Sequence, residues 1–188
     1  MTIVILAAGA ARRMGSQKLL LPIDGRPMIA HAIAAAARWP RVVVAGSGLA
    51  PALESSRVLV VRNDAPERGM SHSLALADAA IARSEPIAVL LADLPDITPA
   101  AIAAVVDAYD EDVDVVVPRY REAFVHPVVF GPRARRKIAA LPDGDTIRSL
   151  RDDTSLHRRI VTVDCNVGTD IDTPGDYRKR VRRNLPKT

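Results

Sequence analysis

Five short apolar runs, most of them separated by helix-like segments, constrain the fold of this chain more than any other feature. The runs are rich in valine, isoleucine and leucine and lie at residues 2–6, 41–46, 56–63, 86–95 and 112–118. Such β-branched runs are typical of strands that are buried on both faces, as in parallel sheets. Segments of helical composition lie at residues 27–39, 69–84 and 98–110. This alternation predicts a three-layer, Rossmann-like α/β fold, with a mostly parallel sheet and helices on both faces.

The remainder of the chain changes character after residue 118. It predicts an extended piece, two short helices, a final strand and a closing helix, at residues 124–132, 133–141, 145–153, 158–164 and 173–183. Thr98 and Thr173 each precede a proline, which is the pattern of an N-cap followed by the first helical residue. No linker or internal repeat divides the sequence, so we expect a single domain over residues 1–188, with frayed residues at 184–188.

Composition excludes several classes of protein. The 188 residues are 48% hydrophobic, which is enough for a globular core. Aromatic residues make up only 3%, whereas single-stranded nucleic-acid binders stack bases on aromatic side chains. Much of the net charge of +4 lies at the C-terminal end of the chain. We interpret that end as a solvated helix face, with a nucleic-acid arm as the alternative, and expect no nucleic-acid partner.

The sequence also predicts a cytoplasmic protein. Cys165 is the single cysteine, so no internal disulfide forms. No apolar run approaches the roughly 20 residues of a membrane span. The arginines follow the first apolar stretch rather than precede it, so we expect neither a signal peptide nor a membrane partner.

A glycine-rich loop follows the first predicted strand, in the stretch LAAGAARRMGSQK at residues 6–18. It is not a Walker A motif, because two residues separate Gly15 from Lys18, and no G-x-G-x-x-G is present. Gly9 and Gly15 nevertheless allow backbone N–H groups to turn toward an anion, and Arg13 and Lys18 carry the charge to neutralise phosphate oxygens. The alternative is a structural turn with solvated cations.

Three aspartates are candidate metal ligands. Asp93 closes the apolar run of the fourth predicted strand, where a carboxylate is costly unless it is paired or metal-bound. Magnesium prefers carboxylates together with substrate phosphates. Asp170 and Asp172 alternate around Ile171, so in an extended segment both point to the same side. Either one completes a site with Asp93 if the final strand returns near the fourth; the alternative for Asp93 is a loop cap.

Several stretches together resemble one family, the MobA-like nucleotidyltransferases. The segment LAAGAARRMGSQKLLLPIDGRPMI resembles the signature loop of that family, GMSHSLALA its G-M-S-x-S-L segment and LADLPDIT its A-D-M-P segment; HPVVF and DIDTPGDY also fit. Ala8 and Gln17 favour the molybdenum cofactor cytidylyltransferases as the closest group. Val125 departs from that group, which carries a glycine before the residues equivalent to His126 and Pro127.

The resemblance implies a nucleotide-diphospho-sugar transferase type of fold and a reaction. CMP would be transferred from CTP to molybdopterin with Mg²⁺, and pyrophosphate would be released. Arg13 would bind the departing phosphates, Lys18 would stabilise the α-phosphate, and Asp93 would hold the metal with Asp170 or Asp172. His126 and Pro127 would contact the acceptor. The nucleotide site would comprise Leu6, Ala7, Ala8, Gly9, Arg13, Gly15, Lys18, Asn63, Gly69, Ser71 and Ser73.

Other interpretations of these residues stay open. The same chemistry serves a sugar phosphate, a polyol phosphate or phospholactate as acceptor. A non-catalytic protein that delivers a nucleotide or cofactor is a further alternative. His72 is interpreted as a solvent-facing helix residue rather than a general base. The cationic residues of segment 133–137 are interpreted as a solvated helix face, with an acceptor rim or a docking surface for a molybdoenzyme as the alternative.

Overall fold

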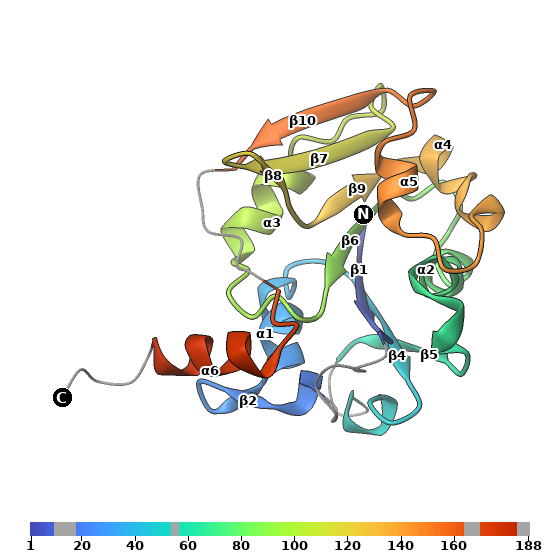
Figure 1. The fold of residues 1–188 in the computed structure, drawn as a ribbon. Helices are drawn as coiled ribbons and strands as arrows, with labels where there is room; N and C mark the ends of the chain where they lie inside the picture. The colour runs from blue at the N-terminus through green and yellow to red at the C-terminus, as the bar shows by residue number, and fades with distance from the viewer. Residues whose placement is uncertain (10–17, 54–56, 164–169, 184–188) are drawn as a thin grey trace.

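The computed structural model describes residues 1–9, 18–53, 57–163 and 170–183. Within these ranges an eight-stranded sheet forms the middle layer, in the order β10-β7-β9-β6-β1-β4-β5, with β8 paired to β7 (Figure 1). The strands are β1 (Thr2–Ala7), β4 (Arg41–Gly46), β5 (Leu59–Asn63), β6 (Ile87–Leu91), β7 (Val115–Tyr120), β8 (Ala123–Phe124), β9 (Val128–Phe130) and β10 (Arg158–Thr162). A separate hairpin joins β2 (Pro22–Ile23) to β3 (Arg26–Pro27).

The sheet is mostly parallel, as the sequence predicts. β1 lies between β6 and β4 and is parallel to both, β4 is parallel to β5, and β7 is parallel to β10. The extended piece predicted at 124–132 contributes β9, which runs antiparallel between β6 and β7. The central strands β1 and β6 therefore end at the same edge of the sheet.

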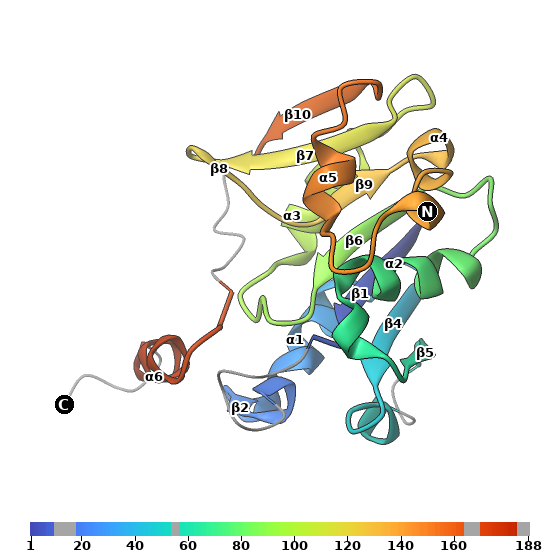
Figure 2. The same cartoon turned by 45° about the vertical axis from the view of Figure 1, so that its right-hand side comes forward.

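Helices cover both faces of the sheet and complete three layers (Figures 1 and 2). They are α1 (Met28–Ala35), α2 (Met70–Ala79), α3 (Pro99–Val106), α4 (Pro132–Arg135) and α5 (Ile147–Arg151), whereas α6 (Pro174–Arg182) lies beside the β2–β3 hairpin. Ile3 and Ile5 of β1 pack in one buried cluster with α1 and α3. Val4 and Leu6 pack in the other cluster with α2, α4 and α5. Side chains that alternate along β1 thus explain its unbroken apolar run.

The helices are shorter than the sequence predicts, although both predicted N-caps are confirmed. Thr98 accepts a hydrogen bond from Ala101 N at 3.2 Å, and Thr173 forms a capping box with Asp176. The helix expected over residues 27–39 ends at Ala35. Its last part tightens into turns in which N–H groups bond three residues back, a common way to satisfy the carbonyls of a helix end.

The final strand does not return beside the fourth strand. β10 lies at the edge of the sheet against β7, and β7 and β9 separate it from β6. The segment just before α6 makes the return instead, because Ile171 N donates a hydrogen bond to Asp93 O at 3.2 Å. Cys165 and the end predicted to fray, 184–188, lie outside the described residues. Among the helices that the structure describes, none is long and apolar enough to cross a membrane.

Candidate functional site

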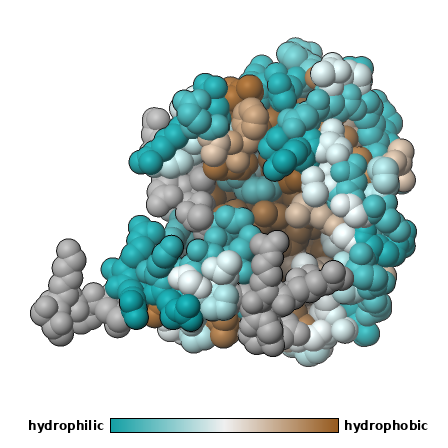
Figure 3. Space-filling view, viewed as in Figure 1, coloured by the Kyte–Doolittle hydropathy of each residue, from teal (hydrophilic) through white to brown (hydrophobic). Residues whose placement is uncertain are grey.

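A cavity of about 320 Å³ opens where β1 and β6 end. The two strand ends lie side by side, since Ala92 N donates to Leu6 O at 3.2 Å. The start of α2 forms another wall. The lining residues are Leu6, Ala7, Ala8, Gly9, Lys18, Leu19, Pro66, Gly69, Met70, Ser73, Leu91, Ala92, Asp93 and Asp172. Figure 3 shows a hollow on this side of the molecule, with apolar side chains inside and hydrophilic ones around it. In open α/β sheets this edge is the usual place for ligands.

Three charged side chains meet in this cavity. Lys18 Nζ donates to Asp93 Oδ2 at 2.7 Å, to Asp172 Oδ1 at 3.0 Å and to Ile171 O at 3.0 Å. Burial opposes the charge of the ammonium, but the two carboxylates outweigh it and raise the pKa of Lys18 above its ordinary value. The structure therefore brings together three residues that the sequence suggests as site residues from widely separated positions.

The carboxylates of this cluster fit a divalent cation. Asp93 Oδ1 is buried, and among the described residues it has no hydrogen-bond partner. The described part of the chain contains no group of three or more histidine, cysteine or acidic side chains that could by itself hold a metal. Two carboxylates that leave further positions to substrate oxygens are the arrangement that Mg²⁺ favours. In this structure the Lys18 ammonium supplies the positive charge between the two aspartates.

Asp170 and Asp172 separate into different cavities, so only Asp172 reaches Lys18. Asp170 lines the neighbouring cavity, where removal from solvent and the charges of Asp172 and Asp93 raise the pKa of its carboxyl. Their spacing predicts that the two side chains point to the same side of an extended segment. The structure differs, because the chain turns into α6 here and each aspartate has different neighbours. Of these two aspartates, Asp172 is the one that shares the Lys18 ammonium with Asp93.

The start of α2 supplies the polar wall of the cavity. Gly69 and Ser73 line it, and the N-terminus of this ten-residue helix carries a partial positive charge that favours anions. Asn63 is fully buried behind Ser73 and donates to its Oγ at 2.9 Å. Ser71 Oγ donates to Pro142 O at 2.8 Å. Asn63 and Ser71 thus hold the wall rather than line the cavity.

Gly69 is required where α2 begins, for two reasons. Its φ is +92°, and a Cβ added there would lie 2.7 Å from the Cα of Gly144. We expect Gly69→Ala to lower the free energy of unfolding by more than about 2 kcal/mol, since backbone strain and overpacking add. Gly144→Ala is the matched control, because its φ is +82° but nothing lies within 4 Å of the added Cβ. If urea denaturation gave both variants the same loss of unfolding free energy, the close approach of Gly69 to Gly144 would not explain the effect.

A second cavity of about 480 Å³ adjoins the first and shares Met70 and Leu91 with it. It is lined by Met70, Leu91, Leu94, Phe124, Val125, His126, Val128, Thr146, Ile147, Arg148, Arg151 and Asp170. His126 Nδ1 lies 3.2 Å from Val89 O, and burial lowers the pKa of this imidazole. His126 is thus a lining residue, whereas Pro127 is buried and does not line the cavity.

Sequence reasoning did not single out Arg148, Arg151 and Phe124 as residues of this wall. The guanidinium of Arg151 lies 4.7 Å from the centre of the Phe124 ring, and the ring is 40% exposed. Two arginines three residues apart on a predicted short helix could have indicated an anion-binding wall. The sequence does not show which cavity they face, because that depends on how the helix packs. His72 is half-buried on α2. Arg13 and Gly15 lie outside the described residues.

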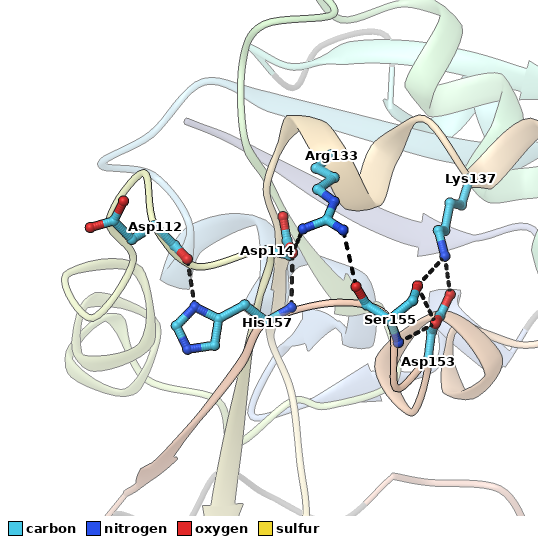
Figure 4. Close-up of polar contacts among 7 residues, drawn as sticks. All are labelled: Asp112, Asp114, Arg133, Lys137, Asp153, Ser155 and His157. Atoms are coloured by element: carbon cyan, nitrogen blue, oxygen red, sulfur yellow. Dashed lines mark hydrogen bonds and ion pairs between the residues drawn. The ribbon is translucent and has the colours of Figure 1, made fainter.

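The solvated face predicted at 133–137 is confirmed for Arg133, Arg136 and Lys137, whose side chains are exposed, and is wrong for Arg135. Arg135 is 1% exposed and pairs with Asp78. Figure 4 shows that Arg133 reaches Asp114 and Ser155 O, and that Lys137 reaches Asp153 and Ser155. These contacts tie α4 to the loop before β10. Most of the positive charge expected for an acceptor rim or docking surface is therefore used within the chain.

Asp153 provides a test of these contacts by pH. The hydrogen bonds from Lys137 and Ser155 lower the pKa of Asp153 to about 2. Because its pKa is lower in the folded chain, the pairing stabilises the fold above the ordinary carboxyl pKa and loses this contribution as the pH falls toward about 2. An NMR titration of the carboxyl carbon should find this low pKa, and Lys137→Met should raise it. An ordinary pKa in the unmodified protein would contradict the pairing.

Comparison with known proteins decides the family. The model of the MobA-like NTP transferase domain matches residues 3–159, most of the chain. The chain belongs to this family. The resemblance drawn from the glycine-rich loop is thereby confirmed, as is the nucleotidyltransferase class.

Relatives of this MobA-like domain include longer proteins. The bifunctional protein GlmU of Rhodospirillum rubrum is 35% identical over 174 residues, which are 88% of this chain and 37% of that protein. This chain thus spans little more than a third of that relative.

Solved structures resemble the MobA-like domain over nearly all of its length. A homologue of Mycobacterium tuberculosis Rv0371c from Mycobacterium sp. strain JC1 has a TM-score of 0.85 and 28% identity, over 97% of this chain and 95% of that chain. Rv0371c from Mycobacterium tuberculosis H37Rv in complex with manganese has a TM-score of 0.79 and 25% identity, over 96% and 97%. A similar domain thus binds a divalent metal.

Proposed function

We propose that this protein transfers a nucleoside monophosphate from a nucleoside triphosphate to a phosphorylated acceptor, with release of pyrophosphate. The observation that carries the proposal is the position of the Lys18–Asp93–Asp172 cluster in the first cavity, next to a second cavity that shares two wall residues with it. The nucleotide occupies the first cavity, and the acceptor occupies the second.

In the proposed reaction an oxygen of the acceptor phosphate attacks the α-phosphorus, and the bond to the β-phosphate oxygen breaks. The backbone of Ala8 and Gly9 lines the cavity where the phosphates bind, and the N-terminus of α2 adds positive potential. Lys18 stabilises the charge that develops on the α-phosphate. Asp93 and Asp172 would hold Mg²⁺, which would neutralise phosphate charge when bound. No general base is needed, because the acceptor phosphate is already ionised.

The finer assignment is CTP as donor and molybdopterin as acceptor. It rests on Ala8 and Gln17 in the signature loop and on the second cavity, about 480 Å³, with Arg148 in its wall beside Arg151, which is paired with Asp152. A sugar phosphate or phospholactate would use the same two arginines. The identity of the acceptor is therefore the first thing to determine.

The deciding experiment measures pyrophosphate release with Mg²⁺ for CTP, GTP, ATP and UTP. Each is combined in turn with molybdopterin, a sugar 1-phosphate and phospholactate. Release with CTP and molybdopterin alone supports the full assignment. Release with another acceptor supports nucleotidyl transfer but rejects molybdopterin as the acceptor. No release with any pair, despite tight nucleotide binding, would favour a delivery protein.

The assignment of the acceptor cavity predicts a selective effect of Arg148. We expect Arg148→Ala to raise the KM for the acceptor by about 10-fold to 100-fold, the effect of losing a charged hydrogen bond to phosphate. The KM for the nucleotide should stay unchanged. Arg136→Ala removes an equal charge from an exposed position outside both cavities and serves as the control. An equal rise in both KM values would contradict the division into two subsites.

A further inference from the structure

The three charged residues of the first cavity belong to three different segments of the chain. Outside the cavity, the same three segments contact one another again. Lys18 is followed by the β2–β3 hairpin, Asp93 by the loop to α3, and Asp172 by α6. One side chain of α6, Arg180, touches the other two segments. Its Nε donates to Asp96 Oδ1 at 2.7 Å, and its Nη2 donates to Asp24 Oδ2 at 2.8 Å.

Arg180 is not an ordinary surface ion pair. Its side chain is 12% exposed, and the two carboxylates it bridges belong to different segments, Asp24 in the turn of the hairpin and Asp96 three residues after Asp93. A guanidinium presents its donors in a rigid planar fork, so two such contacts fix the angle as well as the distance between partners. Tyr177, one helical turn earlier, adds a hydrogen bond from its hydroxyl to Pro22 O at 2.7 Å.

A shift of α6 would be passed on to the cavity. Asp172 directly precedes Thr173, the N-cap of α6, and the capping box of Thr173 and Asp176 fixes the start of the helix. On the other side of Asp172, Ile171 N bonds Asp93 O, and Ile171 O accepts from Lys18 Nζ. A displacement of α6 would therefore move the backbone that carries Asp172.

We propose that Arg180 is a positioning residue, which sets Asp172 and Lys18 in register with Asp93 by tying their three segments together. The inference rests on the proposed function, because it concerns the carboxylates that would hold the metal. Arg180 touches neither cavity and takes no part in the chemistry. Removal of its side chain would therefore act indirectly, by changing the relative positions of Lys18, Asp93 and Asp172.

The test compares Arg180→Ala with Arg178→Ala, which removes an equal charge from an exposed position on the same helix. Binding of Mn²⁺ alone, followed by the EPR signal of the free ion, reports the carboxylate geometry without turnover. We expect Arg180→Ala to weaken Mn²⁺ binding and to lower kcat by about tenfold each, as for other residues that orient metal ligands. The KM for the nucleotide should match that of Arg178→Ala, and every variant is measured well below its own thermal midpoint. Arg180→Lys keeps the positive charge but loses the planar guanidinium. Its Mn²⁺ affinity and kcat should lie between those of the unmodified protein and Arg180→Ala.

Each outcome decides the inference. Wild-type Mn²⁺ affinity and kcat in Arg180→Ala would overturn it, as would a loss that only follows the unfolded fraction. Weaker Mn²⁺ binding in Arg180→Ala, with a wild-type protein that transfers no nucleotide, would reject the proposed function and keep the positioning role. A wild-type protein that neither binds Mn²⁺ nor transfers nucleotide would overturn both.

Discussion

Replacing Asp93 with asparagine is expected to lower the rate of nucleotidyl transfer by about 100-fold or more, as when one electrostatic group of an active site is removed. The side chain is 17% exposed, and its Oδ2 accepts from Lys18. The amide keeps the shape and one acceptor oxygen, so the fold should persist while the negative charge that faces Lys18, and that would hold the metal, is lost. The measurement is steady-state pyrophosphate release at saturating nucleotide.

Asp107→Asn is the matched control for this variant. It makes the same chemical change at an exposed carboxylate that follows α3 and lines neither cavity. We expect its rate to equal that of the unmodified protein. A full rate in Asp93→Asn, measured at limiting and at saturating Mg²⁺, would remove Asp93 from the proposed chemistry.

The second large effect concerns stability and lies away from the cavity. Arg135 donates to Asp78 Oδ1 at 2.7 Å and to the carbonyls of Asp78, Ile81, Ala82 and Glu85, so it caps the C-terminal end of α2. Arg135→Met keeps a long side chain but leaves a buried carboxylate and the carbonyls without this donor. We expect the free energy of unfolding to fall by about 3–5 kcal/mol, the usual cost of breaking a buried ion pair.

Urea denaturation of Arg135→Met and Arg136→Met provides the comparison. Arg136 is the next residue and is exposed, so its variant should stay within about 0.5 kcal/mol of the unmodified protein. The double variant Arg135→Met with Asp78→Leu removes both charges, and we expect it to recover part of the loss. A loss below about 1 kcal/mol in Arg135→Met would show that the pair contributes little.

Sequence patterns were reliable for the order of the elements and less so for their ends. The apolar runs predict β1, β4, β5, β6 and β7 because strands buried on both faces need apolar side chains on both. Helix ends were placed too late, since alanine-rich segments continue a helical pattern where the chain has already turned. The antiparallel insertion of β9 left no local signal, because strand order depends on partners far apart in sequence.

The same division holds for the site. Lys18, Asp93 and the pair at 170 and 172 were recognisable as charged residues at strand ends or in a glycine-rich loop. Their convergence was not, and neither was the separation of Asp170 from Asp172 into two cavities. Arg135 was taken for a solvated residue, because a basic run on a short helix does not show which of its members points inward.

The sequence by itself determined the alternating α/β pattern, the glycine-rich loop of the family and the identity of the charged residues that follow the strands. These features are local, so propensity, periodicity and spacing express them directly. Tertiary structure alone decided that Asp172 meets Lys18 and Asp93, that Arg148 and Arg151 face the second cavity, and that Arg180 ties three segments together. Those contacts join residues up to 156 positions apart, and they exist only because packing of the whole sheet and its helices brings their segments together.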